Sequence, residues 1–280
     1  MNPRTVCRAL PGLALALTTA TLADSSANVA TTLPSLSTLL QSGATTSAPP
    51  AARPSVSIFD EMYLLADVGV AIPQDANIKN IASTATSGGL SGTKVSLNTG
   101  MRFDAGLGFN VTDWLAVEVA SGLIWNSVDR VEGTILDTTG GLLGADLPLS
   151  GGSGDIYNVP IMFNGQVRLP VGKDLKLLLG GGIGTVWSDA SVDSITTTAI
   201  PGLQAAVSGN SWAFAYQANV GLEWELAKNL ALGVRYSFLG TTEVNYGPAS
   251  FNTPTIVGVS DVKADAIYTH SILATLKLEF

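Results

Sequence analysis

The sequence predicts an all-β protein, an eight-stranded antiparallel up-and-down barrel that spans a membrane. Three observations support this prediction. Only 13% of the 280 residues are charged although 46% are hydrophobic, whereas charged residues make up about 25% of an ordinary soluble domain. From Met62 onward, apolar residues recur with a period of two, which is the signature of strands with two different faces. Tight turns and long loops also alternate along the chain.

The first 57 residues are expected to lie outside the barrel. Arg4 and Arg8 precede an uncharged segment at 9–23, and small residues occupy Thr21 and Ala23 at the positions of a cleavage site. Residues 1–23 therefore predict a secretory signal peptide. Residues 24–57 are rich in Ser, Thr, Ala and Pro, and such a segment buries too little apolar surface to offset its ordering entropy. We interpret it as a flexible periplasmic leader, which leaves residues 58–280 for the barrel.

Eight alternating segments follow, each long enough to cross a bilayer at the roughly 9–11 residues that a tilted strand needs. In the last one, Ile272, Leu276 and Leu278 share one face while Thr275 and Lys277 share the other. The predicted strands are 62–72, 97–110, 114–127, 156–169, 174–188, 211–226, 230–240 and 265–280.

The connections between these strands fall into two classes. Three are tight, at 110–113, 170–174 and 227–229, and contain turn-forming residues. Four are loops of over 20 residues that are rich in Gly, Ser, Thr and Asn, at 73–96, 128–155, 189–210 and 241–264. Short turns at one end and long extracellular loops at the other are typical of barrels of the bacterial outer membrane.

A soluble eight-stranded barrel of the lipocalin kind would also alternate, so the tryptophans help to decide between the two architectures. All five lie near predicted strand ends, three towards the long loops and two towards the tight turns, as aromatic girdles at the two membrane interfaces would. These girdle residues are Trp125, Trp187 and Trp212 on the loop side and Trp114 and Trp224 on the turn side. The other face of the strands is mostly Gly, Ala, Ser and Asn, too poor in charge for a water-exposed surface.

The few charges of the strands fall on the face opposite the apolar one, which is the lumenal face if the apolar face meets lipid. An eight-stranded barrel is just wide enough for side chains to fill. We therefore expect an ion-pair network that plugs the lumen, because buried charges need partners. The alternative function of the same charges is a narrow, selective pore. The residues of the expected network are Asp67, Arg102, Asp104, Glu118, Arg168, Glu223 and Arg235.

Three stretches of the chain carry a resemblance to a known family. They are Asn-Val-Pro-Ile-Met-Phe-Asn at 158–164, Leu-Ala-Lys-Asn-Leu at 226–230, and the ending on Phe280. With the eight-strand rhythm, residues 58–280 resemble the small outer-membrane barrels of the outer membrane protein A and opacity protein type. The resemblance implies a last-strand signal for the barrel assembly machinery, and a setting of outer-membrane lipid and lipopolysaccharide. The signal residues would be Ile272, Leu276, Leu278 and Phe280.

The resemblance also raises lipid-modifying enzymes as an alternative, since deacylases among small barrels carry a His-x-Ser arrangement. Here Ser271 follows His270 directly, so the two side chains point to opposite faces of a strand. We expect no enzyme, no cofactor and no metal site. Nucleic acid is not an expected partner, because the chain after residue 23 carries 12 − 22 = −10 charges. A structural or surface-interaction role is expected, with a possible extracellular ligand at the loops.

Overall fold

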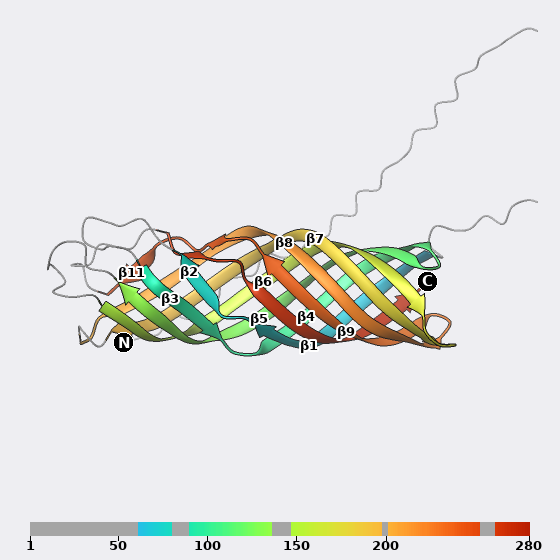
Figure 1. Ribbon diagram of the computed structural model, residues 1–280, viewed down its shortest axis with the longest axis horizontal. Helices are drawn as coiled ribbons and strands as arrows, with labels where there is room; N and C mark the ends of the chain where they lie inside the picture. Colours follow the sequence, from blue (N-terminus) through green and yellow to red (C-terminus); the bar gives the residue numbers. More distant parts are fainter. Residues whose placement is uncertain (1–60, 80–89, 136–146, 198–200, 253–260) are drawn as a thin grey trace, which may run out of the picture. The chain divides into compact units, whose positions relative to one another are not determined.

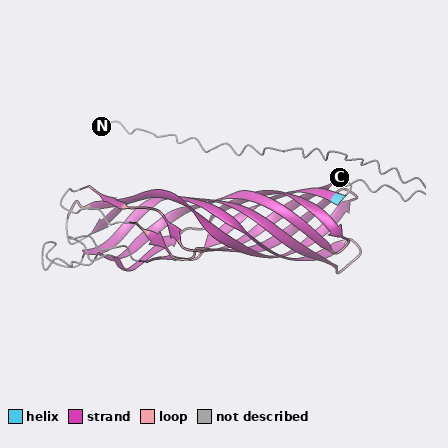
Figure 2. Ribbon diagram, turned by 90° about the horizontal axis from the view of Figure 1, so that it is seen from above, coloured by secondary structure: helices cyan, strands magenta, loops and turns pink. Residues whose placement is uncertain are grey.

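The computed structural model describes residues 61–79, 90–135, 147–197, 201–252 and 261–280. The predicted signal peptide and the leader lie outside these residues. Most of the described chain is β-strand (Figure 2). Within it, no helix has the length and apolar character that crossing a membrane requires.

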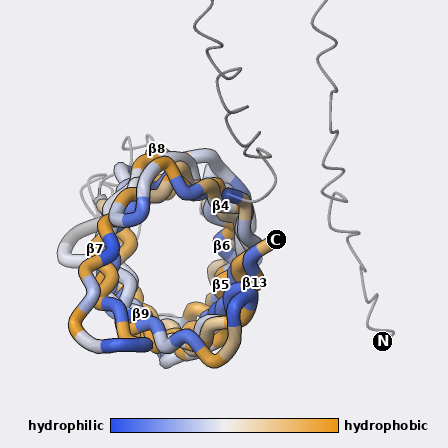
Figure 3. Tube along the Cα trace, turned by 90° about the vertical axis from the view of Figure 1, so that its right-hand side faces the viewer, coloured by the Kyte–Doolittle hydropathy of each residue, from blue (hydrophilic) through white to orange (hydrophobic). Residues whose placement is uncertain are grey.

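Eight strands close into a ring in which every neighbour is antiparallel (Figure 3). The ring closes where the first and last of them pair, with Tyr63 opposite Glu279 at one end and Pro73 opposite Thr269 at the other. The eight-stranded up-and-down barrel is therefore confirmed. In ring order, the strands are β1 (Met62–Pro73), β4 (Gly100–Thr112), β5 (Leu115–Ile135), β6 (Leu147–Pro170), β7 (Leu175–Thr197), β8 (Gln204–Ala227), β9 (Leu230–Thr241) and β13 (Tyr268–Glu279).

The three tight turns lie where the sequence predicts them. Residues 113–114 join β4 to β5, 171–174 join β6 to β7, and 228–229 join β8 to β9. In the first turn, the hydroxyl of Thr112 accepts a hydrogen bond from the backbone N–H of Leu115 at 3.0 Å. In barrels of the outer membrane, short turns of this kind lie at the periplasmic end.

The long loops are predicted wrongly, because much of them is strand. β5 to β8 are 21 to 24 residues long, so they take in large parts of the loops expected at 128–155 and 189–210. The loops expected at 73–96 and 241–264 contain five short strands. These are β2 (Ala76–Lys79), β3 (Leu90–Leu97), β10 (Val244–Asn245), β11 (Ala249–Phe251) and β12 (Lys263–Ala264).

The short strands and the outer ends of β5 to β8 form one structure, which we call the extension (Figure 1). β3 pairs with β5, β2 with β3, β12 with β2 and β10 with β12, while β11 pairs with β8. The sheet of the barrel thus continues past the ring of eight. At this level, short strands take the places of β1, β4, β9 and β13.

Local irregularities explain why the sequence pattern hides the extension. The pairing of β7 with β8 shifts register between Val192 and Ile195, and Ser194 within that shift has a positive φ of 59°. The pairing of β3 with β5 shifts twice. Each shift displaces the period of two by a residue, so that apolar positions stop alternating in the sequence while they still share a face in space.

Candidate functional site

The lumen of the ring is crossed by contacts between opposite walls. Arg102 on β4 donates a hydrogen bond from Nη2 to Oε1 of Gln217 on β8, at 3.0 Å. Counted around the ring in either direction, β4 and β8 are four strands apart, so this bond spans the diameter. The Nη1 atom of Arg102 also donates to the hydroxyls of Ser237 and Ser271, at 3.1 and 3.4 Å.

A second contact crosses the lumen at Arg235 on β9. Its Nη1 lies 3.6 Å from a carboxylate oxygen of Glu118 on β5, the strand directly opposite. The same atom lies 3.5 Å from Asp67 on β1. Glu118 also accepts a hydrogen bond from the hydroxyl of Tyr63 at 2.8 Å, so each group has a partner while it is shielded from water.

The seven residues expected to form one network all lie in the lumen, but their ion pairs form separate groups. Arg102 pairs with Asp104 at 2.7 Å, next to the cluster of Arg235, Asp67 and Glu118. Arg168 and Glu223 have partners outside the seven expected residues.

Glu223 pairs with Lys277 at 3.1 Å. Arg168 forms no ion pair among the described residues; it donates to the side-chain oxygen of Asn110 and lies over the ring of Tyr63. Lys277 is 1% exposed on the lumenal face of β13, where the alternation of the sequence places it, although the expected network did not include it.

Little space remains between these side chains. Among the described residues, the lumen holds a cavity of about 10 Å³ beside Arg102, Asp104, Gln217 and Arg235. A single water needs roughly 10–15 Å³. At this level the lumen is therefore filled by its own side chains.

The aromatic residues mark two levels on the outside of the barrel, but the outer level is not at the strand ends. Trp114 and Trp224 lie at the turn end, as predicted, and are 54% and 60% exposed. Trp125 and Trp187 lie well inside β5 and β7, and Trp212 is eight residues inside β8. The position of the last three at strand ends was a wrong prediction, because the strands run on past them.

Tyrosines complete the outer level, a contribution that the sequence analysis missed. Tyr157 stacks on Trp125 with ring centroids 6.5 Å apart, and Trp187 pairs across strands with Trp212. Phe238 stacks on Tyr268 at 5.8 Å. The shared outward parity of these rings on neighbouring strands was the available signal.

The two levels are separated by the thickness of a membrane. Trp212 and Trp224 are twelve residues apart on β8. At roughly 3.3 Å per residue and a tilt of about 45°, this separation is about 28 Å along the membrane normal, close to the ~25 Å apolar band of such barrels. By the same arithmetic, the eight residues of β8 beyond Trp212 extend roughly 20 Å further. The extension therefore projects beyond the band between the two aromatic levels, on the side away from the tight turns.

The two faces of the sheet exchange character at the outer aromatic level. On the turn side of this level, the outward side chains of β8 are apolar, as at Phe214 and Val220, while the inward ones include Gln217 and Glu223. In the extension, on the other side of this level, the inward residues of β8 include Ala205 and Val207. The outward residues there are Gln204, Ala206, Ser208 and Asn210.

β7 shows the same exchange. Asp189, Ser191 and Asp193 lie outward above Trp187, whereas Ala190 and Val192 are buried within. The extension is thus built like a soluble barrel, on top of a barrel of the opposite polarity.

The outer surface of the extension carries exposed ion pairs. Asp75 pairs with Lys94 at 2.5 Å, and Lys263 with Glu243 at 3.3 Å. The hydrogen bond from Lys94 lowers the pKa of the Asp75 carboxyl below its ordinary value. Exposed pairs of this kind contribute little to stability. Their presence indicates that this surface faces water.

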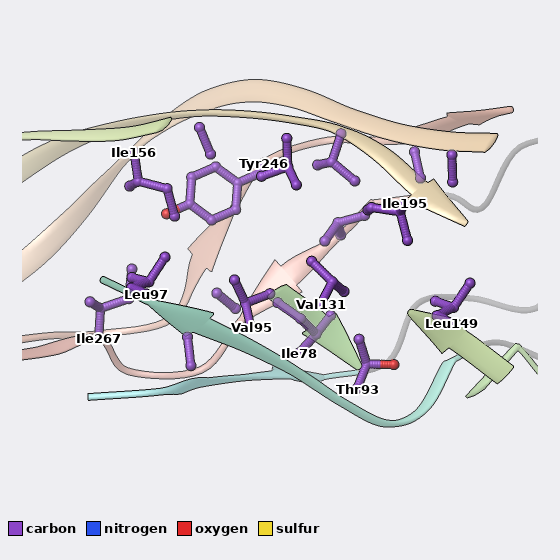
Figure 4. A pocket seen from close by; sticks show the side chains of 18 residues that line it. Ile78, Thr93, Val95, Leu97, Val131, Leu149, Ile156, Ile195, Tyr246 and Ile267 are labelled. Atoms are coloured by element: carbon purple, nitrogen blue, oxygen red, sulfur yellow. The ribbon is translucent and has the colours of Figure 1, made fainter. Parts of the chain in front are cut away.

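Inside the extension lies an apolar cavity, which we call the chamber (Figure 4). Its volume is about 80 Å³ and 18 side chains line it, of which 16 are Ala, Val, Leu or Ile. The others are Thr93 and Tyr246. The hydroxyl of Tyr246 is bonded to Ser188 at 2.8 Å, and burial raises the pKa of Tyr246 to about 12. This hydroxyl therefore stays neutral at physiological pH.

The residues weighed for catalysis face opposite sides of β13. His270 lies on the outer surface, where Nδ1 is 2.7 Å from the hydroxyl of Tyr236 and Nε2 is 2.8 Å from the side chain of Gln74. Ser271 is fully buried in the lumen, beside Arg102. Within the described part of the chain, no group of three His, Cys, Asp or Glu residues could hold a metal ion.

The residues of the expected assembly signal lie along the outer face of β13. Ile272, Leu276 and Leu278 are 52%, 39% and 42% exposed. Phe280 is 59% exposed, and its backbone N–H donates to the carbonyl of Met62 at 3.1 Å.

A family model described as outer membrane protein beta-barrel domain matches residues 38–280. Among solved structures, the chain is similar to the outer membrane protease OmpT from Escherichia coli, at 10% identity over 81% of this chain and 99% of that one, with a TM-score of 0.49. OprG from Pseudomonas aeruginosa matches at 16% identity over 78% and 96%, with a TM-score of 0.42. The neisserial surface protein NspA matches at 14% identity over 79% and 97%, with a TM-score of 0.40. No curated protein sequence matches the chain significantly.

Proposed function

Since this chain belongs to the outer membrane protein beta-barrel domain family, we propose that it is a non-conducting barrel with a structural or surface-interaction role. In this proposal the ring of eight strands is an anchor in the outer membrane. The extension is the part that acts, because it is presented to the exterior beyond the outer aromatic level.

The observation that carries the proposal is the pair of contacts across the diameter of the lumen. Arg102 reaches Gln217 and Arg235 reaches Glu118, each on the opposite wall. A solute would have to separate both contacts and leave buried charges without partners, which is costly in a low-dielectric interior. These contacts favour a plug over a narrow pore.

We expect the purified barrel to give no stable conductance in planar lipid bilayers at neutral pH. The physical reason is the filled lumen, whose cavity beside Arg235 holds about one water. A 16-stranded porin in the same bilayers is the positive control, since such barrels enclose an aqueous channel. Discrete, reproducible channel openings would overturn the plug and favour the pore.

We propose that the barrel has no lipid-modifying activity. The support is that the side chain of Ser271 is turned away from the lipid surface on which His270 lies, so nucleophile and base cannot meet. Unchanged lipid A masses after overexpression are the expected result, and a new deacylated species would contradict the proposal.

We further propose that outer-membrane lipid and lipopolysaccharide surround the barrel, and that the barrel assembly machinery inserts it by reading β13. Deleting Phe280 should reduce the folded fraction in the outer membrane several-fold, because this residue directly follows the strand that closes the ring and its backbone N–H bonds to Met62 on β1. The folded form is measured by heat-modifiable mobility in gels.

Leu226→Ala is the matched control for this deletion, since Leu226 is similarly exposed at 53% but lies on β8. Equal insertion of the wild-type and deleted chains would contradict a role of Phe280 in assembly.

A further inference from the structure

The chamber is an apolar cavity in a part of the molecule that water surrounds. Its walls come from both sides of the extension, with Ile156, Tyr246 and Ile195 facing Leu97, Val95 and Val131 in Figure 4. A water molecule needs roughly 10–15 Å³ of such space, so about 80 Å³ is several times that requirement. The space suits a group of several non-hydrogen atoms.

The lining offers such a group almost no polar partner. No charged side chain lines the chamber. Two hydroxyl groups lie in the lining. The hydroxyl of Tyr246 is hydrogen-bonded to Ser188, whereas the buried hydroxyl of Thr93 has no hydrogen-bond partner among the described residues. Water in an apolar cavity lacks the two to four partners that hold a buried water, and cavities of this kind stay dry and bind small apolar molecules.

Buried side chains fill the barrel next to the chamber. A layer of six buried apolar residues, which includes Ile124, Met162 and Val186, lies inside the ring. Under it lie the contacts of Arg102 and Arg235 across the lumen. With the plug proposed above, a molecule in the chamber has no path through the lumen, which suits the chamber to retention more than to passage.

We propose that the chamber is a binding site for a hydrocarbon group, either a small free hydrocarbon or the end of an alkyl chain. Contact with the 16 aliphatic side chains drives binding, since removing apolar surface from water is favourable in proportion to the area buried. The site goes beyond the surface role proposed above. Binding in the chamber does not require a closed lumen. Conductance tests the plug and titration tests the chamber, so failure of one proposal can be distinguished from failure of the other.

The test uses the full barrel in lipid nanodiscs with ¹³C-labelled isoleucine methyl groups. Ile78, Ile156, Ile195 and Ile267 report the chamber. Isoleucines on the lipid-facing surface of the same molecule, Ile183 and Ile272, report partition of the added compound into the bilayer. Titration with n-hexane should shift the chamber methyl signals saturably, while the lipid-facing signals change linearly.

A second arm with octanoate distinguishes the two sources of the hydrocarbon. Saturation by both compounds indicates an alkyl chain whose polar head stays outside the chamber. Saturation by hexane alone indicates a free hydrocarbon. Absence of saturable shifts in the chamber signals with either compound would overturn the proposal.

Two variants on adjacent residues give the matched control. Ala205→Leu places a larger side chain in the chamber, whereas Ala206→Leu adds the same atoms to the outward face of β8. Ala205→Leu should weaken binding by at least about tenfold, equivalent to lost contact with two methylene groups, and Ala206→Leu should leave it unchanged.

Equal affinity in the wild-type and Ala205→Leu barrels would overturn the assignment of the site. Should Ala205→Leu fail to fold, Ala190→Leu on β7 fills the same chamber from the neighbouring strand. The wild-type titration tests the proposal without either variant.

Discussion

An Ala218→Arg substitution should lower the free energy of unfolding by about 2–4 kcal/mol, the cost of an arginine that faces lipid at mid-bilayer. Ala218 lies on the outward face of β8, six residues from both Trp212 and Trp224. It therefore sits midway between the two aromatic levels. The measurement is equilibrium unfolding in urea from phospholipid vesicles.

Ser208→Arg is the matched substitution. Ser208 lies on the same strand and the same outward face, four residues beyond Trp212. If the extension is in water, an arginine there should change stability by less than ~0.5 kcal/mol, as substitutions at exposed sites usually do. Similar costs at both positions would mean that the membrane boundary is not at the outer aromatic level.

Arg235→Ala should destabilise the barrel by about 3–5 kcal/mol, because removing one partner of a buried ion pair leaves uncompensated charge. Arg235 is 4% exposed and faces both Asp67 and Glu118. Without it, two carboxylates remain buried in one part of the lumen. Unfolding in urea and loss of the heat-modifiable folded band would both report the effect.

Two controls separate burial from charge alone. Lys176→Ala removes the cation of a half-exposed pair with Glu225 at the turn end, and such pairs are worth about 0–1 kcal/mol. Arg235→Lys keeps the charge but loses the planar guanidinium, which can serve two carboxylates at once, so an intermediate loss is expected. A loss in Arg235→Ala no greater than that in Lys176→Ala would contradict the importance of the contact across the lumen.

The membrane part of the fold could be predicted because its physical constraint acts on each strand separately. A charge that faces lipid is costly wherever it occurs, so Asp67, Arg102 and Glu118 all had to fall on the inner parity of their strands. The same alternation located the eight strands and, through their turn residues, the three tight turns.

The pairing of the lumenal charges could not be predicted in the same way. Parity places Glu223 and Lys277 inside but does not say that they meet, and it suggested carboxylate partners for Arg168, which instead contacts Asn110 and Tyr63. Partners are chosen by the register and closure of the ring, which bring residues from opposite walls to the same height.

The extension was missed for a further reason. Around Ser194 and between β3 and β5 the register shifts, and the inner and outer faces exchange polarity above Trp187 and Trp212. When the register shifts and the polarity of the two faces is exchanged, the apolar residues no longer alternate regularly along the sequence. Such a segment then has the sequence pattern of a loop.

Sequence alone was thus sufficient for the class of barrel, its eight strands and the side of each strand that meets lipid, since those follow from local alternation and the cost of charge in a membrane. The contacts across the lumen, the length of β5 to β8 and the chamber arise only when the ring closes. Their side chains come from strands far apart in sequence, and no local pattern records which of them will face one another.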